Sequence, residues 1–234
     1  KNLGVVFGQR SQLYWDLRLG ESFELLARIY EVSKEKYKAN MEELDRILNI
    51  NEIINTPVRQ LSLGQRMRGD LAAAMLHSPS ILFLDEPTIG LDVEVKYAIR
   101  RFIKEINAKY ETTVILTTHD LDDVQALCER VIIISEGKIV ADSSLDTLIE
   151  NTSPYRMLVV DLFDGGSDIT HPKAEVVRAE AQRVTLKFKK SDISAAELIK
   201  DISSGYAVKE LSLLESDIDD VIRHIYKQNA AVKK

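Results

Sequence analysis

The 234-residue sequence contains one cysteine, Cys128. An internal disulfide framework is therefore excluded, and this cysteine usage is typical of a reducing compartment. No apolar run approaches the roughly 18 residues that a membrane-spanning helix needs, and no secretory signal is visible. The net charge of -6 provides no basic footprint for nucleic acid. The content of 45% hydrophobic and 29% charged residues is ordinary for a soluble globular protein, so any membrane-spanning part would come from a partner.

What the sequence does contain is concentrated in residues 60–92. The segment Ile81–Leu84 is a continuous apolar run between Pro79 and Pro87, which is typical of a short strand buried on both faces of a parallel sheet. Asp85 and Glu86 follow at the carboxyl end of this strand. Ligands bind at that edge in open α/β sheets.

The two carboxylates have two interpretations. Asp85 would suit a hard cation such as Mg²⁺. By strand alternation Glu86 would point the other way, where it would serve as a general base toward a water molecule. A bare pair of this kind is more often a solvated acidic turn, so the choice depends on the surrounding residues.

A capped helix precedes the strand. Ser62 and Gln65 form an S-x-x-Q capping box, and the helix stops before Pro79. Gly64 in the first turn weakens the helix, which makes sense if another group approaches the backbone closely. Such a helix N-terminus suits an anion, although a capped surface helix would have the same pattern.

Five motifs, taken together and in order, resemble those of the ATP-binding-cassette (ABC) ATPases. Residues 61–65, LSLGQ, resemble the LSGGQ signature loop, with Leu63 where a glycine is usual. The other four resemble the Q-loop (Val5–Gln9), the Walker B strand with its catalytic glutamate (Ile81–Glu86), the D-loop (Pro87–Asp92) and the switch histidine (Thr117–Asp120). The resemblance covers about residues 1–150 and implies a P-loop NTPase fold.

The resemblance also implies roles for individual residues. Glu86 and His119 would be catalytic, and Asp85 and Gln9 would contact Mg²⁺. The residues expected to contact ATP are Ser62, Gly64, Gln65, Gln9 and Asp92. Two cassettes would pair head to tail around ATP and drive a transmembrane permease subunit. The protein would then be cytoplasmic, peripheral on the inner face of the cell membrane, with no nucleic-acid partner.

One expected motif is missing. ABC ATPases carry G-x-x-x-x-G-K-[ST] before the Q-loop, and its backbone N–H groups and lysine hold the phosphates. This sequence contains no such motif and opens at the strand that leads into the Q-loop. We therefore expect an N-terminally truncated cassette that binds ATP poorly alone and does not hydrolyse it. We also expect an uncovered apolar sheet face that promotes self-association.

Two domains are predicted. The fold class is α/β for residues 1–151, an incomplete ABC ATPase sheet with a helical subdomain at about 20–78. Within that subdomain, helices are expected at Glu21–Tyr37 and Met41–Ile50. After a polar turn at 151–154, residues 155–228 predict a small α+β domain like that appended to some exporter ATPases. Its role is interpreted as regulation or self-association.

Other functional classes remain possible. ABC-type cassettes also occur in translation factors and chromosome-maintenance proteins, but the acidic balance and the lack of basic arms or heptads argue against both. A non-hydrolysing interaction module is the third alternative, given the missing phosphate loop. The aromatic run Gln12–Leu17 and the second domain favour an exporter.

Overall fold

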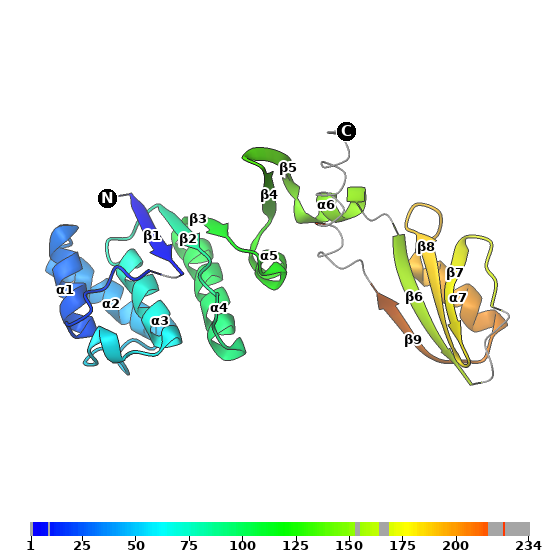
Figure 1. Cartoon of the computed structure of the whole chain (residues 1–234), viewed down its shortest axis with the longest axis horizontal. Coiled ribbons are helices and arrows are strands. Elements are labelled where there is room, and N and C mark those ends of the chain that lie inside the picture. Colours follow the sequence, from blue (N-terminus) through cyan, green and yellow to red (C-terminus); the bar gives the residue numbers. More distant parts are fainter. Residues whose placement is uncertain (1, 9, 153–154, 164–168, 215–221, 223–234) are drawn as a thin grey trace. The chain divides into compact units, whose positions relative to one another are not determined.

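The computed structural model describes residues 2–8, 10–152, 155–163, 169–214 and 222 (Figure 1). The chain divides into two compact units, Lys1–Leu127 and Cys128–Lys234. The sequence-predicted boundary near residues 151–155 lies inside the second unit and stays a prediction. In the described part of the chain, no helix is both long enough and apolar enough to span a bilayer.

A three-stranded parallel sheet forms the centre of the first unit. Its strands are β1 (Leu3–Phe7), β2 (Ile81–Asp85) and β3 (Thr113–Thr117), in the order β1-β2-β3. All three strands were expected from the sequence. The register pairs Phe7 with Asp85 and Asp85 with Thr117, so the three carboxyl ends meet at one edge.

The two faces of this sheet differ. Leu82 and Leu84 are fully buried in a core shared with the neighbouring helices. Parallel sheets normally bury both faces, yet on the opposite face the strands expose large side chains. These are Leu3 (50% exposed), Phe7 (49%), Ile81 (38%) and Ile115 (45%).

The helical part of the first unit contains α1 (Leu19–Ile29), α2 (Lys34–Leu48), the short 3-10 turn Val58–Gln60 and α3 (Leu63–Met75). The predicted single helix over Glu21–Tyr37 is wrong. The chain leaves α1 through Glu31, which has a φ of 56°, and Ser33 then caps α2 by accepting from the Lys36 amide. A second cap signal inside the apolar pattern thus divides the predicted helix into two.

Two further helices flank strand β3. The long helix α4 (Val93–Tyr110) buries Ile99, Phe102 and Ile106. The short helix α5 (Leu121–Leu127) follows the strand and completes the first unit.

The second unit begins with a hairpin. Strands β4 (Arg130–Ser135) and β5 (Lys138–Ser144) are joined by Glu136 and Gly137, both with positive φ, as a two-residue hairpin turn requires. Helix α6 (Leu145–Thr152) follows, and its Leu148 shares a small apolar cluster with Ile133.

A four-stranded antiparallel sheet completes the second unit. Its strands are β6 (Tyr155–Leu162), β7 (Ala174–Glu180), β8 (Arg183–Lys189) and β9 (Val208–Leu214), in the order β7-β8-β6-β9. Helix α7 (Ala195–Gly205) buries Leu198 and Ile202 in the same cluster as Leu158 and Leu186. Alternation of apolar and polar residues along β8 predicted such a half-covered sheet.

Candidate functional site

The candidate site begins at the carboxyl end of β2. Asp85 Oδ1 accepts a hydrogen bond of 2.5 Å from the Thr117 hydroxyl on β3. The Glu86 amide donates to the Thr117 carbonyl at 2.9 Å, and Glu86 has a φ of 52°. A positive φ is unfavourable for glutamate and occurs most often where the surrounding structure imposes it. The turn therefore places the Glu86 side chain by backbone constraint.

Gly8, which directly follows strand β1, also lies at this edge. The Gly8 amide donates to the Asp85 carbonyl at 2.6 Å. A Cβ at position 8 would lie only 2.2 Å from the Glu86 carbonyl oxygen. Position 8 therefore requires glycine because two backbones approach each other closely here.

His119 follows β3 and contacts Glu86. Its Nδ1 lies 2.8 Å from Glu86 Oε1, although the two residues are 33 positions apart in sequence. The hydrogen bond to Glu86 is the main cause of a raised His119 pKa, with the charge of Glu86 adding to it. The imidazole remains 72% exposed, so it is open to a ligand.

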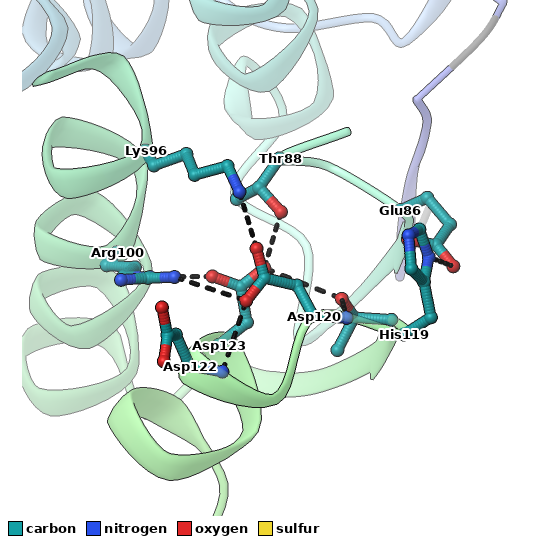
Figure 2. Close-up of polar contacts among 9 residues, drawn as sticks. Glu86, Thr88, Lys96, Arg100, His119, Asp120, Asp122 and Asp123 are labelled. Carbon is teal, nitrogen blue, oxygen red and sulfur yellow. Dashed lines mark hydrogen bonds and ion pairs between the residues drawn. The ribbon is translucent and has the colours of Figure 1, made fainter. Parts of the chain in front are cut away.

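Behind this pair lies a network of charges that the sequence did not predict (Figure 2). Asp123 is fully buried at the start of α5 and accepts a 2.6 Å bond from Arg100 Nε of α4. It also accepts from the hydroxyl of Thr88, which follows Glu86 by two residues. One buried carboxylate thus connects α4 to the chain just beyond the acidic strand end.

A second carboxylate extends this network to the histidine loop. Asp120, adjacent to His119, lies 2.5 Å from Lys96 Nζ and 3.7 Å from Arg100. The Lys96 hydrogen bond is the main cause of a lowered Asp120 pKa. The sequence signal for this network is limited to spacing. Lys96 and Arg100 are four residues apart on α4, and Asp120 and Asp123 are three residues apart.

The N-terminus of α3 has the predicted capping box. The Gln65 amide donates to Ser62 Oγ at 3.2 Å, and the Ser62 amide donates to Gln65 Oε1 at 2.9 Å. Ser62 is exposed. A Cβ at Gly64 would lie 3.0 Å from Val95 Cγ2. A neighbour within the same chain therefore explains the absence of a side chain at Gly64.

Asp92 also has a structural role. Its Oδ1 caps α4 by accepting from the Val95 amide at 2.9 Å. Because Val95 also packs against Gly64, the turn before α4 and the tip of α3 lie side by side. Gln9, predicted to contact nucleotide and metal, lies outside the described residues.

The donor set fits a hard cation only in part. Asp85 supplies a carboxylate at a strand end, and Mg²⁺ commonly takes just one or two carboxylates together with water and phosphate oxygens. No cluster of three or more histidine, cysteine or acidic side chains suited to a metal occurs among the described residues. Phosphate oxygens would have to complete the site, and the backbone cradle that holds phosphates is absent from the sequence.

Comparison with known proteins places this architecture in one class. The ATP-binding cassette MJ0796, solved as a dimer in a post-hydrolysis state with ADP and Pi, superposes with a TM-score of 0.54. The alignment has 29% identity and covers 62% of this chain and 63% of that chain. The parallel sheet and its helices therefore have the fold of an ABC ATPase cassette.

Sequence relatives give the same answer. The ABC transporter ATP-binding protein NatA of Bacillus subtilis is 31% identical over 64% of this chain and 61% of its own length. The daunorubicin resistance ATP-binding protein DrrA3 of Streptomyces coeruleorubidus is 27% identical over 98% of this chain and 74% of its own. A family described as "AAA domain, putative AbiEii toxin, Type IV TA system" matches residues 22–122.

By these matches the chain is similar to the ATP-binding proteins of ABC transporters. The chain spans about three fifths of the length of NatA. The activity and partners of the whole protein are therefore proposed below.

Proposed function

We propose that this chain is the ATP-binding and hydrolysing part of an ABC transporter ATPase, working as one half of a nucleotide-sandwiching pair. The 2.8 Å contact between Glu86 and His119 carries this proposal. It joins the ends of two parallel strands at the sheet edge where α/β folds bind ligands. A solvated acidic turn, the simpler interpretation, would not require a histidine from another strand.

Glu86 and His119 have complementary roles in this proposal. Glu86 accepts a proton from the attacking water. The backbone turn holds its carboxylate in place for this role. His119 is exposed and has a raised pKa, so it donates a hydrogen bond toward the terminal phosphate. Asp85 and Gln9 would hold Mg²⁺, and the charge of the ion would neutralise that of the phosphates. The Thr117 hydroxyl keeps Asp85 oriented.

The second half of the site comes from another ATPase subunit. The exposed Ser62, with Gly64 and Gln65, lies at the N-terminus of α3, where the helix dipole attracts an anion. Asp92 lies beside this tip and would contribute at the same interface. In this arrangement one subunit's α3 faces the phosphate held near its partner's Glu86.

Hydrolysis requires a complete cassette. The sequence contains no phosphate-binding loop, so the 234-residue chain lacks most of the phosphate donors. We expect no measurable ATP turnover from the chain alone. Robust phosphate release that survives removal of contaminating ATPases would contradict this expectation.

The decisive test uses a cassette completed with a Walker A segment. Glu86→Gln should abolish phosphate release and trap an ATP-dependent dimer, as followed by gel filtration with ATP and Mg²⁺. Glu94→Gln, which changes an exposed acid in the first turn of α4, is the control and should hydrolyse ATP normally. Normal hydrolysis by the Glu86→Gln variant would exclude Glu86 as the base.

We further propose a permease subunit as the membrane partner and export as the direction of transport. Related ATP-binding proteins named for import and for drug resistance both match the chain. The export proposal therefore rests on the aromatic segment 12–17 and on the second domain. Co-purification from membranes with a permease, followed by transport in inside-out vesicles, would test it. Uptake in right-side-out vesicles would instead show that the direction of transport is import.

A further inference from the structure

Asp70 is a buried acid for which the proposed reaction has no use. It lies in α3, two turns after the helix tip, and only 3% of its surface is exposed. Burial raises its pKa from 3.8 to about 6, against the opposing effects of the Ser11 and Gln12 hydrogen bonds and of Arg66. A buried carboxylate destabilises a fold unless its partners compensate, so those partners indicate what it does.

The partners of Asp70 all come from one short segment. Asp70 Oδ1 accepts a 2.9 Å bond from the Ser11 hydroxyl and a 3.1 Å bond from the Gln12 amide. The Gln12 side chain donates back to the Asp70 carbonyl at 3.1 Å, and the Leu13 amide donates to Ser11 Oγ at 3.1 Å. Three hydrogen bonds thus join Asp70 to Ser11 and Gln12, and a fourth, within the segment, holds the Ser11 hydroxyl.

The rest of this segment, residues 11–19, follows the same surface. Gly69 leaves room for Leu13 and Leu19, whose side chains would lie 3.1 Å and 2.9 Å from a Cβ at that position. Trp15 lies near Arg66 of α3, with the guanidinium carbon 5.7 Å from the ring centroid. The segment is therefore in contact with α3 over more than one turn.

We propose that Asp70 is a positioning residue that fastens the segment following Gln9 to helix α3. Gln9 is then bracketed in the sequence by two anchors. Gly8 is held to the acidic end of β2, and Ser11 and Gln12 are held to the helix that carries Ser62 at its tip. The effect of this anchor on catalysis rests on the proposed function. A shift of α3 would be transmitted through Asp70 to the residues next to Gln9.

The chemistry of the contact explains why a carboxylate stands at position 70. A single oxygen accepts both a hydroxyl and a backbone amide, and hydrogen bonds to an ionised acceptor are stronger than neutral ones. Asparagine retains one carbonyl oxygen in the same place, whereas alanine retains none. The pair Asp70→Asn and Asp70→Ala therefore separates loss of charge from loss of the anchor.

Trp15 is a built-in reporter, because it is the only tryptophan in the chain. It is 54% exposed, so release of the segment can raise its accessibility by at most about twofold. The experiment measures acrylamide quenching of Trp15 in the whole chain, without nucleotide. Hydrogen exchange at the Gln12 and Leu13 amides is measured in parallel. Asp70→Ala should approach the twofold limit in quenching and accelerate amide exchange by about tenfold or more, as loss of a bond to a charged acceptor implies.

Two comparisons make the result specific. Asp45→Ala is the matched control, because Asp45 also accepts from a backbone amide, that of Asn51 at 2.6 Å, but belongs to α2. It should leave Trp15 quenching unchanged. Asp70→Asn should restore most of the protection lost in Asp70→Ala, and Ser11→Ala should reproduce part of that loss.

The outcomes separate this proposal from the previous one. If Trp15 quenching and Gln12 exchange are the same in Asp70→Ala and in the original chain, Asp70 does not anchor the segment. If Asp70→Ala does not fold, the same readouts on Ser11→Ala decide the question, and unchanged Trp15 quenching and Gln12 exchange in that variant would overturn the proposal. Failure of a completed cassette to hydrolyse ATP would overturn the proposed function but leave this result standing, because no nucleotide enters the experiment.

Discussion

Burial of Asp70 should give the first unit a pH-dependent stability that the Asp70→Asn variant lacks. Burial raises the pKa of the Asp70 carboxyl from its ordinary value of 3.8 to about 6 in the folded state. At 1.36 kcal/mol per unit, keeping this carboxylate ionised destabilises the fold by ~3 kcal/mol at neutral pH. The native state binds more protons than the unfolded chain between these two pKa values, so stability falls as pH rises through that window.

The contribution of the Asp70 carboxylate to the unfolding free energy can be isolated by comparing two proteins at two pH values. For a pKa that moves from 3.8 to about 6, the linkage relation gives a penalty of roughly 1.6 kcal/mol at pH 5 and roughly 3 kcal/mol at pH 7.5. The difference in unfolding free energy between Asp70→Asn and the original chain should therefore grow by about 1.4 kcal/mol over that interval. Any constant effect of the new amide, such as an unpaired N–H, cancels in this comparison.

Urea unfolding followed by Trp15 fluorescence is the appropriate assay, because Trp15 lies in the first unit and reports on its unfolding. Both proteins are measured at pH 5 and pH 7.5. The equivalent comparison for Asp45→Asn controls for the general loss of a carboxylate. If the stability difference for Asp70→Asn stays constant within about 0.5 kcal/mol, the Asp70 carboxylate has an ordinary pKa and the reasoning from burial fails.

Three further predictions concern the rest of the first unit. Arg100→Ala leaves the buried Asp123 without its cation and should destabilise the fold by about 3–5 kcal/mol in the same urea assay; Arg101→Ala, at an exposed neighbouring position, should be nearly neutral. His119 should titrate above 6.5 by NMR, and Glu86→Gln should return it toward that value; an unchanged pKa would mean that the 2.8 Å contact does not persist in solution. Because the sheet exposes an apolar face, light scattering should detect self-association that weakens in Ile115→Lys, and a monomer at all concentrations would refute this.

Much of the first unit could be predicted because its signals are local. Pro79 and Pro87 delimit β2, and Ser62 with Gln65 defines the start of α3. The parallel setting of β2 followed from the rule that a strand with a continuous apolar run is buried on both faces of a parallel sheet. The carboxyl ends of such strands share one edge, so the convergence of Asp85, Glu86 and His119 was also predictable in outline.

What the sequence did not predict depends on contacts between distant segments. Nothing local marks Asp123 as the buried partner of Arg100 and Thr88, because an acid at a helix start is more often a solvated first-turn residue. Gly64 was interpreted as room for a ligand, whereas the side chain of Val95 lies against it. Ser33 was overlooked as a cap because the apolar stripe of α1 continues in phase across it. Each of these depends on tertiary packing that one sequence does not reveal.

The contact between Gly8 and the Glu86 carbonyl has a consequence for engineering this protein. The seam between the first strand and the acidic turn has no spare clearance, since even one methyl group there would sit 2.2 Å from an oxygen. A side chain at position 8 would therefore push the backbone of Glu86 away from the end of the first strand. A substitution of Gly8 would therefore displace Glu86 while every charged group of the site stays in the sequence.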